Sequence, residues 1–391
     1  MKVLIVGGTG VLSAAVAVEA IRRGISVTMI NRGTRPIPAG AKLIKADKDD
    51  FQSIGLALRD TYYDAAIDFL CLTDRQTEKS VRFYSCYAKQ YLYISSCAVY
   101  NTALLAGKIG NEESPKQLDI WDYSIGKWES EKLLISLFES LDSYYTIVRP
   151  CVTYDNTRIP YGIAPTYGYH WTLCARVLAG KPLIKWNGGV NRCNIMRVED
   201  FAVGVVGLIG NPQAYNEAYN ICGDETPSWN EILDAIGEVL KKKVQTVDIS
   251  SEFYANEMPD YRGDILGGRS IDSINSNDKI KKIVPDFGQR INYKEGIART
   301  IEAYKAQNYQ KGIDWTFDAC TDRIINKWNK SNNISYRKLF FVDYLGDANL
   351  KGRYLYWIEY NKKNGLVKAW IMLGRYARKT FVKITRIFIK K

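Results

Sequence analysis

Short runs of apolar, often β-branched residues alternate with helical stretches over the first 150 residues. Runs this apolar are typical of strands in a parallel sheet that helices cover on both faces. The alternation therefore predicts βαβ units and a doubly wound α/β fold built on a parallel sheet. The predicted strands are Lys2–Val6, Ser26–Ile30, Lys42–Ile44, Ala65–Leu70, Gln90–Ser95 and Tyr145–Val148.

After about residue 155 the pattern loosens into loops, shorter helices and strand-like pieces. We therefore predict a first α/β domain over 1–155 and a smaller α/β substrate-binding domain over 156–330. A later segment near 190–215 is expected to return to the first domain. Beyond residue 331 the composition turns to Lys, Arg and aromatic residues, which predicts a separate basic appendage over 331–391.

The composition describes a folded protein of roughly two domains, because 46% of its 391 residues are hydrophobic and 25% are charged. This excludes a disordered chain and a disulfide scaffold. Eight widely spaced cysteines without a CxxC pair, and one histidine, predict a reduced cytoplasmic protein with no metal site. The apolar N-terminus is interpreted as a buried strand, not a signal peptide, and no run of 18 or more apolar residues occurs.

The glycine-rich stretch GGTGVLS follows the first predicted strand and opens a helix. Glycines at that place permit a tight turn and let backbone N–H groups approach a pyrophosphate, whose charge also suits a helix N-terminus. A plain strand-to-helix turn is the alternative. The stretch predicts a dinucleotide site, and its cofactor-binding residues are Gly7, Thr9, Gly10, Val11 and Leu12.

The second predicted strand ends in Asn31, where an NAD-selective site would carry an acid for the ribose 2′-hydroxyl. Arg32 and Arg35 offer positive charge to a 2′-phosphate, so NADP is favoured over NAD. A surface Arg after a strand is the alternative interpretation. Asp47, after the third strand, is placed where an acid could reach the adenine amino group.

Three polar residues form the predicted catalytic set: Ser96 ends a strand, and Tyr123 and Lys127 lie four apart on one face of a helix. A tyrosine is a poor base at neutral pH, but a nearby cation favours its phenolate. Lys127 would supply that cation and bind the nicotinamide ribose. Ser96 would bond the substrate oxygen while Tyr123 exchanges a proton with it during hydride transfer.

These motifs resemble the extended short-chain dehydrogenase/reductases, specifically the NAD(P)-dependent epimerase/dehydratase family, over roughly residues 1–330. The resemblance implies a Rossmann domain followed by a sugar-binding domain, a nucleotide-sugar substrate, and a homodimer formed through the helix that carries Tyr123. It also implies that Phe69, Leu70 and Pro150 bind the cofactor. The matching stretches are GGTGVLS, INRG, YISSCAVY, YSIGK, VRPCVTY, MRVEDFA and YNICGDETPSWNEILDAIGEVL.

One departure from the family pattern bears on the reaction. Sugar 4,6-dehydratases of this kind carry an Asp-Glu pair after the Ser/Thr, whereas this chain has Cys97 and Ala98. Without the acid pair the elimination lacks its proton donor and base, which leaves a 4-epimerase or a 4-ketoreductase, expected in surface polysaccharide biosynthesis. The rival hypothesis is an NADP-binding scaffold or RNA-binding protein of the same superfamily, in which catalysis is dispensable.

Four residues are predicted to contact the substrate. Cys97 and Tyr154 are chosen from the matching stretches, His170 from an aromatic segment, and Arg192 from a loop near the expected nucleotide diphosphate. For His170 the alternative is a packed structural residue, and for Arg192 it is a solvent-exposed loop residue.

The C-terminal segment 351–391 carries twelve Lys and Arg residues and one acid, Glu359, so its net charge is +11 of the total +12. Its apolar residues recur at helical spacing, which predicts a basic amphipathic helix at an anionic membrane surface through 366–391, and hence a peripheral place at the inner face. A helix packed on its own protein is the alternative, and nucleic acid is not the expected partner. The apolar stripe is Leu366, Trp370, Leu373, Ala377, Phe381, Ile384 and Phe388.

Overall fold

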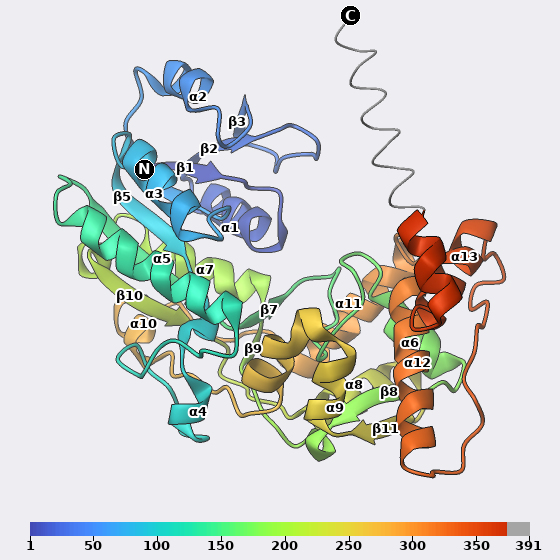
Figure 1. The fold of residues 1–391 in the computed structure, drawn as a ribbon. Helices are drawn as coiled ribbons and strands as arrows, with labels where there is room; N and C mark the ends of the chain where they lie inside the picture. Colours follow the sequence, from blue (N-terminus) through green and yellow to red (C-terminus); the bar gives the residue numbers. More distant parts are fainter. Residues whose placement is uncertain (374–391) are drawn as a thin grey trace, which may run out of the picture.

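The computed structural model describes residues 1–373 and contains, within them, a seven-stranded parallel sheet in the order β10-β6-β5-β4-β1-β2-β3 (Figure 1). The predicted doubly wound α/β fold is therefore confirmed. Its strands are as apolar as expected because helices cover both faces. They are β1 (Lys2–Val6), β2 (Ser26–Asn31), β3 (Lys42–Lys45), β4 (Tyr63–Asp68), β5 (Ala88–Ile94), β6 (Tyr144–Pro150) and β10 (Glu217–Ile221).

Two layers of helices bury the sheet. On one face α1 (Val11–Arg22) packs beside α7 (Val198–Leu208), and on the other lie α2 (Phe51–Leu58), α3 (Asp74–Tyr84) and α5 (Asp122–Phe138). The strand β10 falls inside the range predicted for the substrate domain, yet it pairs with β6. The first lobe of the molecule thus contains two later segments, α7 and β10.

The second lobe contains two small parallel sheets and a group of helices (Figure 1). Its aromatic core includes Trp186 and Trp229, whose indole N–H groups both donate to the carbonyl oxygen of Arg269. Its sheets pair β7 (Val152–Tyr154) with β9 (Ile195–Arg197) and β8 (Leu183–Trp186) with β11 (Thr246–Ile249). Its helices include α6 (Trp171–Leu178), α8 (Trp229–Leu240), α9 (Ser251–Glu257), α11 (Tyr293–Ala306) and α12 (Trp315–Ser331). Of the other helices, α10 (Asp278–Ile283) packs against β10 and α7 of the first lobe, and α4 (Thr102–Leu105) follows β5 in the chain.

The chain beyond residue 331 does not leave the body at once, because α13 (Leu350–Tyr360) packs against α12 (Figure 1). A buried cluster fixes this contact: Asp318 and Asp322 of α12 pair with Arg176 and Lys181, and the Tyr356 hydroxyl donates to Asp322 at 2.6 Å. Because a buried charge is expensive unless it is paired, these contacts hold α13 in one place.

A second ionic contact ties the start of the basic segment to the body. Glu257 binds Arg323, Lys327 and Lys363, each at 2.6 Å. Burial raises the pKa of Glu257, but hydrogen bonds from these three cations outweigh it and lower the pKa to about 2. Lys363 thus neutralises a carboxylate of the protein itself.

The predicted apolar stripe begins in a helix over 365–373, in which Leu366, Trp370 and Leu373 are exposed and Val367 is buried. The other stripe residues, Ala377, Phe381, Ile384 and Phe388, lie outside the described residues. Over residues 1–373 the structure contains no helix with the length and hydropathy needed to cross a membrane.

Candidate functional site

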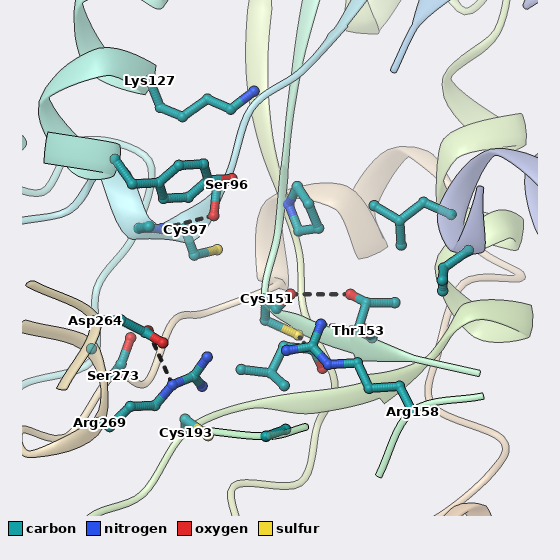
Figure 2. Close-up of a pocket in the computed structure, with 18 of the residues that line it drawn as sticks. Ser96, Cys97, Lys127, Cys151, Thr153, Arg158, Cys193, Asp264, Arg269 and Ser273 are labelled. Carbon is teal, nitrogen blue, oxygen red and sulfur yellow. Dashed lines mark hydrogen bonds and ion pairs between the residues drawn. The ribbon is translucent and has the colours of Figure 1, made fainter. Parts of the chain in front are cut away.

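A cavity of about 770 Å³ lies between the two lobes, at the carboxyl edge of the seven-stranded sheet. Parallel strands all end at this edge, which is where open α/β sheets bind their ligands. Figure 2 shows Ser96, Cys97 and Lys127 above, and Arg158, Arg269 and Asp264 below them. The sheet, the start of α1 and the start of α5 form one wall, and the second lobe forms the other.

The glycine loop between β1 and α1 has the backbone that a dinucleotide site requires. Gly7 and Gly8 have φ values of +106° and +85°, a region that favours glycine. A Cβ atom on Gly8 would lie 2.0 Å from the Met29 side chain, and one on Gly7 would lie 3.3 Å from Leu70. Gly10 then caps α1, and the first turn of α1 carries no acid that would repel an anion. The N–H groups of this turn can therefore donate to an anion. The loop fits a pyrophosphate.

The residues at the ends of β2 and β3 lie along the same edge. The Asn31 side chain donates to the Gly7 carbonyl oxygen at 3.1 Å and accepts from the Gly33 N–H at 2.8 Å, so it braces the loop. The Arg35 guanidinium donates to the Thr9 carbonyl oxygen at 3.2 Å. The side chains of Arg32 and Asp47 are exposed, and the Asp47 carboxylate accepts from the Asp49 N–H at 3.1 Å.

Ser96 and Tyr123 come together at the cavity wall. Ser96 lies two residues beyond β5, where its hydroxyl oxygen accepts from the Ala98 N–H at 3.1 Å and caps a short 3₁₀ turn. Tyr123, in the first turn of α5, is 43% exposed, so its phenol is open to the cavity. Burial raises the pKa of this phenol and the Asp264 carboxylate adds to the rise. A hydrogen bond with Ser96 and the Arg158 guanidinium lower the pKa by less, so the net shift is upward.

Lys127 lies one turn after Tyr123 in α5, with 3% of its surface exposed. Its ammonium donates to the carbonyl oxygens of Cys71 and Ile94, both at 2.9 Å. Burial lowers the pKa of Lys127 to about 8. Its predicted electrostatic effect on Tyr123 stays a prediction. Among the described residues, the Asp264 carboxylate raises the pKa of the phenol and the Arg158 guanidinium lowers it.

A buried ion pair holds α5 against the sheet. Glu131, four residues after Lys127, receives two hydrogen bonds from Arg149, at 2.6 and 3.0 Å, and one from the Ser95 hydroxyl. Arg149 also donates to the Tyr100 hydroxyl at 2.8 Å. A bidentate pair fixes both distance and orientation. Through Glu131 it therefore fixes the position of α5 relative to the end of β5. It therefore positions Tyr123 relative to Ser96.

Two guanidinium groups of the second lobe face this catalytic wall (Figure 2). Arg158 forms no ion pair with a carboxylate within residues 1–373, and burial together with the neighbouring Arg269 lowers its pKa. Arg269 lies 3.1 Å from Asp264. Nearby, the buried His170 accepts from the Ile159 N–H through Nδ1 at 3.0 Å, and burial lowers its pKa to about 3. The arrangement is suited to an anionic group on the ligand.

Nine of the nineteen predicted site residues line the cavity, among them all three of the predicted catalytic set. Two predicted substrate residues do not line it: Tyr154 is buried against Arg197, and Arg192 is exposed and lies 3.6 Å from Glu231. The sequence patterns do not indicate Arg158, which is in a loop, or Arg269, which ends a short helical segment over Asp264–Arg269, because neither has a spacing pattern of its own. The predicted residues that line the cavity are Val11, Leu12, Phe69, Ser96, Cys97, Tyr123, Lys127, Pro150 and His170.

Comparison with known proteins gives matches of sequence and of fold. Residues 3–222 match the model of the NAD dependent epimerase/dehydratase family. A curated relative, the chloroplast stem-loop binding protein of 41 kDa b of Arabidopsis thaliana, is 25% identical over 251 residues, which are 60% of this chain and 62% of that protein.

Solved structures share the fold at lower identity. The UDP-glucose 4-epimerase of Thermotoga maritima, solved with UDP-glucose, superposes with a TM-score of 0.62 at 15% identity and covers 79% of this chain and 100% of its own. The UDP-glucose 4-epimerase of Thermus thermophilus, solved with NAD, superposes with a TM-score of 0.61 at 16% identity and covers 78% of this chain and 99% of its own.

Proposed function

The chain belongs to the NAD-dependent epimerase/dehydratase family, and from that premise we propose that it is an NAD(P)-dependent oxidoreductase of nucleotide-activated sugars, acting as a 4-epimerase or a 4-ketoreductase. The observation that carries the proposal is that Ser96 and Tyr123 share one cavity with Val11 and Leu12, which directly follow a glycine loop of the right conformation. Surface polysaccharide biosynthesis is the expected setting.

The mechanism assigns a task to each residue. NAD(P), when bound, accepts or returns a hydride. The α1 N-terminus, Lys127 and Pro150 would hold it against the catalytic wall. Ser96 orients the sugar hydroxyl by a hydrogen bond, and the Tyr123 oxygen takes the proton from that hydroxyl or returns it. Lys127, in the same helix, and Arg158, across the cavity, are the cations proposed to favour the phenolate, against the Asp264 carboxylate, which opposes it.

The sugar is proposed to carry a diphosphate because of Arg158 and Arg269. A nucleotide-activated sugar brings at least two negative charges into the cavity. A guanidinium group can donate two parallel hydrogen bonds to the oxygens of a phosphate. The UDP-glucose in the Thermotoga maritima structure belongs to this class. Cys97 and Ala98 occupy the positions of the dehydratase acid pair, which supports epimerisation or reduction over elimination.

The choice between NADP and NAD depends on the end of β2. Asn31 is an amide that hydrogen-bonds the glycine loop, and it has no carboxylate to accept from a ribose 2′-hydroxyl. The nearby Arg32 and Arg35 are exposed cations. We therefore favour NADP, although the Thermus thermophilus structure holds NAD. In a binding titration Arg32→Ala should weaken NADP more than NAD, and equal losses would contradict this preference.

The test of the enzymatic proposal is a panel of nucleotide sugars monitored by NADPH absorbance and by product analysis. Tyr123→Phe should lower turnover at least about 100-fold while it retains dinucleotide binding, since it removes one hydroxyl that acts on the proton. Tyr62→Phe, a change at an exposed tyrosine, is the matched control. Turnover that survives Tyr123→Phe for every accepted sugar would refute the proposal.

The same variant separates the rival hypothesis. The Arabidopsis relative is named a stem-loop binding protein. A scaffold or RNA-binding protein should bind NADP without Tyr123, and a salt-sensitive shift of a stem-loop RNA should persist in Tyr123→Phe. Binding of RNA at physiological salt, together with inactivity of the parent on all sugars, would favour this rival.

A second proposal concerns location. Leu366, Trp370 and Leu373 expose apolar surface on a segment with a net charge of +11, a combination that suits an anionic bilayer surface. A deletion should begin at Leu366, because one that begins at 351 would remove Tyr356 from its buried cluster. The shortened chain should no longer sediment with phosphatidylserine vesicles but should retain dinucleotide binding. Undiminished sedimentation would contradict the proposal.

A further inference from the structure

Three cysteines meet at the wall of the cavity, at the ends of three neighbouring strands. Cys97 follows Ser96 beyond β5, Cys151 follows β6, and Cys222 follows β10. The sulfur atoms of Cys97 and Cys222 are 3.4 Å apart. Cys97 and Cys151 line the cavity, whereas Cys222 is fully buried behind them. The nucleotide-sugar mechanism uses none of these thiols.

The sheet register sets Cys151 beside Cys222. Pro150 of β6 and Ile221 of β10 are paired residues of adjacent parallel strands. The next residue on each strand is a cysteine, and adjacent strands are about 4.8 Å apart. This spacing lies within the range of Cα separations that a disulfide spans.

The three thiols differ in reactivity. Burial raises the pKa of the Cys97 and Cys222 thiols. Burial also raises the pKa of Cys151, but hydrogen bonds from Cys222 and from the Gly223 N–H outweigh it, and the net shift is downward. Because the thiolate is the nucleophile, a small oxidant that enters the cavity meets its most reactive thiol at Cys151.

We propose that Cys151 and Cys222 form an oxidisable pair that reacts with hydroperoxides and closes a disulfide beside the catalytic wall, weakening dinucleotide binding. The Cys151 thiolate attacks the peroxide oxygen, which gives a sulfenic acid and releases an alcohol, or water when the oxidant is hydrogen peroxide. The Cys222 thiol then attacks the Cys151 sulfur, the S–S bond forms, and a second water leaves. Two thiols lose two electrons and two protons to the peroxide, and a dithiol reverses the reaction.

Closure of the disulfide should change the cofactor site. A disulfide brings its sulfur atoms to about 2.05 Å, well inside the contact distance of two thiols. Cys151 directly follows Pro150, which lines the cavity, so its movement toward Cys222 shifts that wall. We expect dinucleotide affinity to fall roughly tenfold, because sub-ångström to ångström shifts of a binding wall have effects of this order or larger. This part of the proposal rests on the proposed function.

The experiment uses the full chain with Cys86→Ser, because Cys86 is exposed and would otherwise form disulfides between molecules. The reduced protein is treated with a small excess of hydrogen peroxide, alkylated and mapped by mass spectrometry. The parent should show one linked pair of peptides containing Cys151 and Cys222, and dithiothreitol should abolish it. Cys222→Ser should instead accumulate sulfinic acid at Cys151, and Cys151→Ser should form no disulfide.

The outcomes separate this proposal from the enzymatic one. A disulfide that forms equally fast in Cys151→Ser, or peroxide-treated parent protein without a linked Cys222 peptide, would overturn the oxidisable pair. Dinucleotide binding is measured on reduced protein first, and its absence there would count against the proposed function alone. If the reduced protein binds and the oxidised protein binds equally well, the effect on affinity is refuted. Cys97→Ser serves as the matched control and should form the same disulfide.

Discussion

Replacing Lys127 with methionine tests the reasoning about the catalytic wall without any substrate. Lys127 is 3% exposed, and its pKa is lowered by burial from 10.5 to about 8. The folded chain therefore holds this proton less tightly than the unfolded chain. The ammonium destabilises the fold below about pH 8, and the destabilisation disappears as the pH rises toward 10.5.

The size of the effect follows from linkage. Between about pH 7 and about pH 9.5, this one group should raise the free energy of unfolding by about 2 kcal/mol. A methionine side chain has no proton to exchange, so Lys127→Met should lack this rise. The carbonyl oxygens of Cys71 and Ile94, which lose their donor in the variant, do not titrate, so their cost is the same at every pH.

Urea unfolding of both proteins over this pH range measures the difference. Subtracting the two profiles removes all other titrating groups, so parent minus Lys127→Met should climb by about 2 kcal/mol as the pH rises. Lys132→Met, a change at an exposed lysine on the same helix, should give a flat difference profile. If the difference profile of Lys127→Met is also flat over this pH range, the conclusion that burial lowers the pKa of the Lys127 ammonium is refuted.

Three further predictions address the second lobe and the C-terminal contacts. Arg158→Gln should weaken nucleotide-sugar binding roughly tenfold or more, and dinucleotide binding much less, in calorimetric titrations; equal losses would contradict its placement. Glu257→Gln should lower the free energy of unfolding in urea by about 2 kcal/mol at pH 7. The lowered pKa of Glu257 means that its stabilisation is present above about 4.5 and is lost as the pH falls toward about 2, so the difference should shrink in acid. Tyr356→Phe, which removes the donor to Asp322, should cost about 1 to 2 kcal/mol in the same assay, and no loss would show that the buried cluster does not depend on α13.

The fold could be predicted from the sequence because its determinants are local. A strand covered on both faces must be apolar along its whole length, so β1 and β2 are visible as runs of apolar residues. The glycine loop between β1 and α1 is recognisable for a similar reason, since the positive φ values of Gly7 and Gly8 need that residue type. The position of Ser96 at the end of a strand follows from the same pattern.

Contacts between distant residues could not be predicted in this way. Asp318 and Asp322 look like solvent-facing positions of a polar helix, yet both are buried, because Arg176 and Lys181 reach them from more than 130 residues away. The segment after residue 331 looks like an appendage for the same reason: the partner of Tyr356 is in α12. A charge pattern shows how many charges a segment has but not which of them are paired.

The cation that acts on Tyr123 changes how the two lobes relate to the chemistry. The sequence spacing indicates Lys127, which shares α5 with Tyr123 and would act on it whatever the second lobe does. In the structure a second cation, Arg158 of the loop after β7, lowers the pKa of the Tyr123 phenol, and the Asp264 carboxylate raises it. The backbone N–H of the neighbouring Ile159 donates to Nδ1 of the His170 ring. The backbone N–H of His170 donates to the Tyr304 hydroxyl at 3.1 Å. His170, predicted to face the sugar, thus holds the loop that carries the charge. The second lobe thus brings two opposite charges to the phenol: the Arg158 guanidinium lowers its pKa and the Asp264 carboxylate raises it. Because a Coulomb interaction weakens with distance, the electrostatic environment of Tyr123 depends on how the second lobe is placed across the cavity.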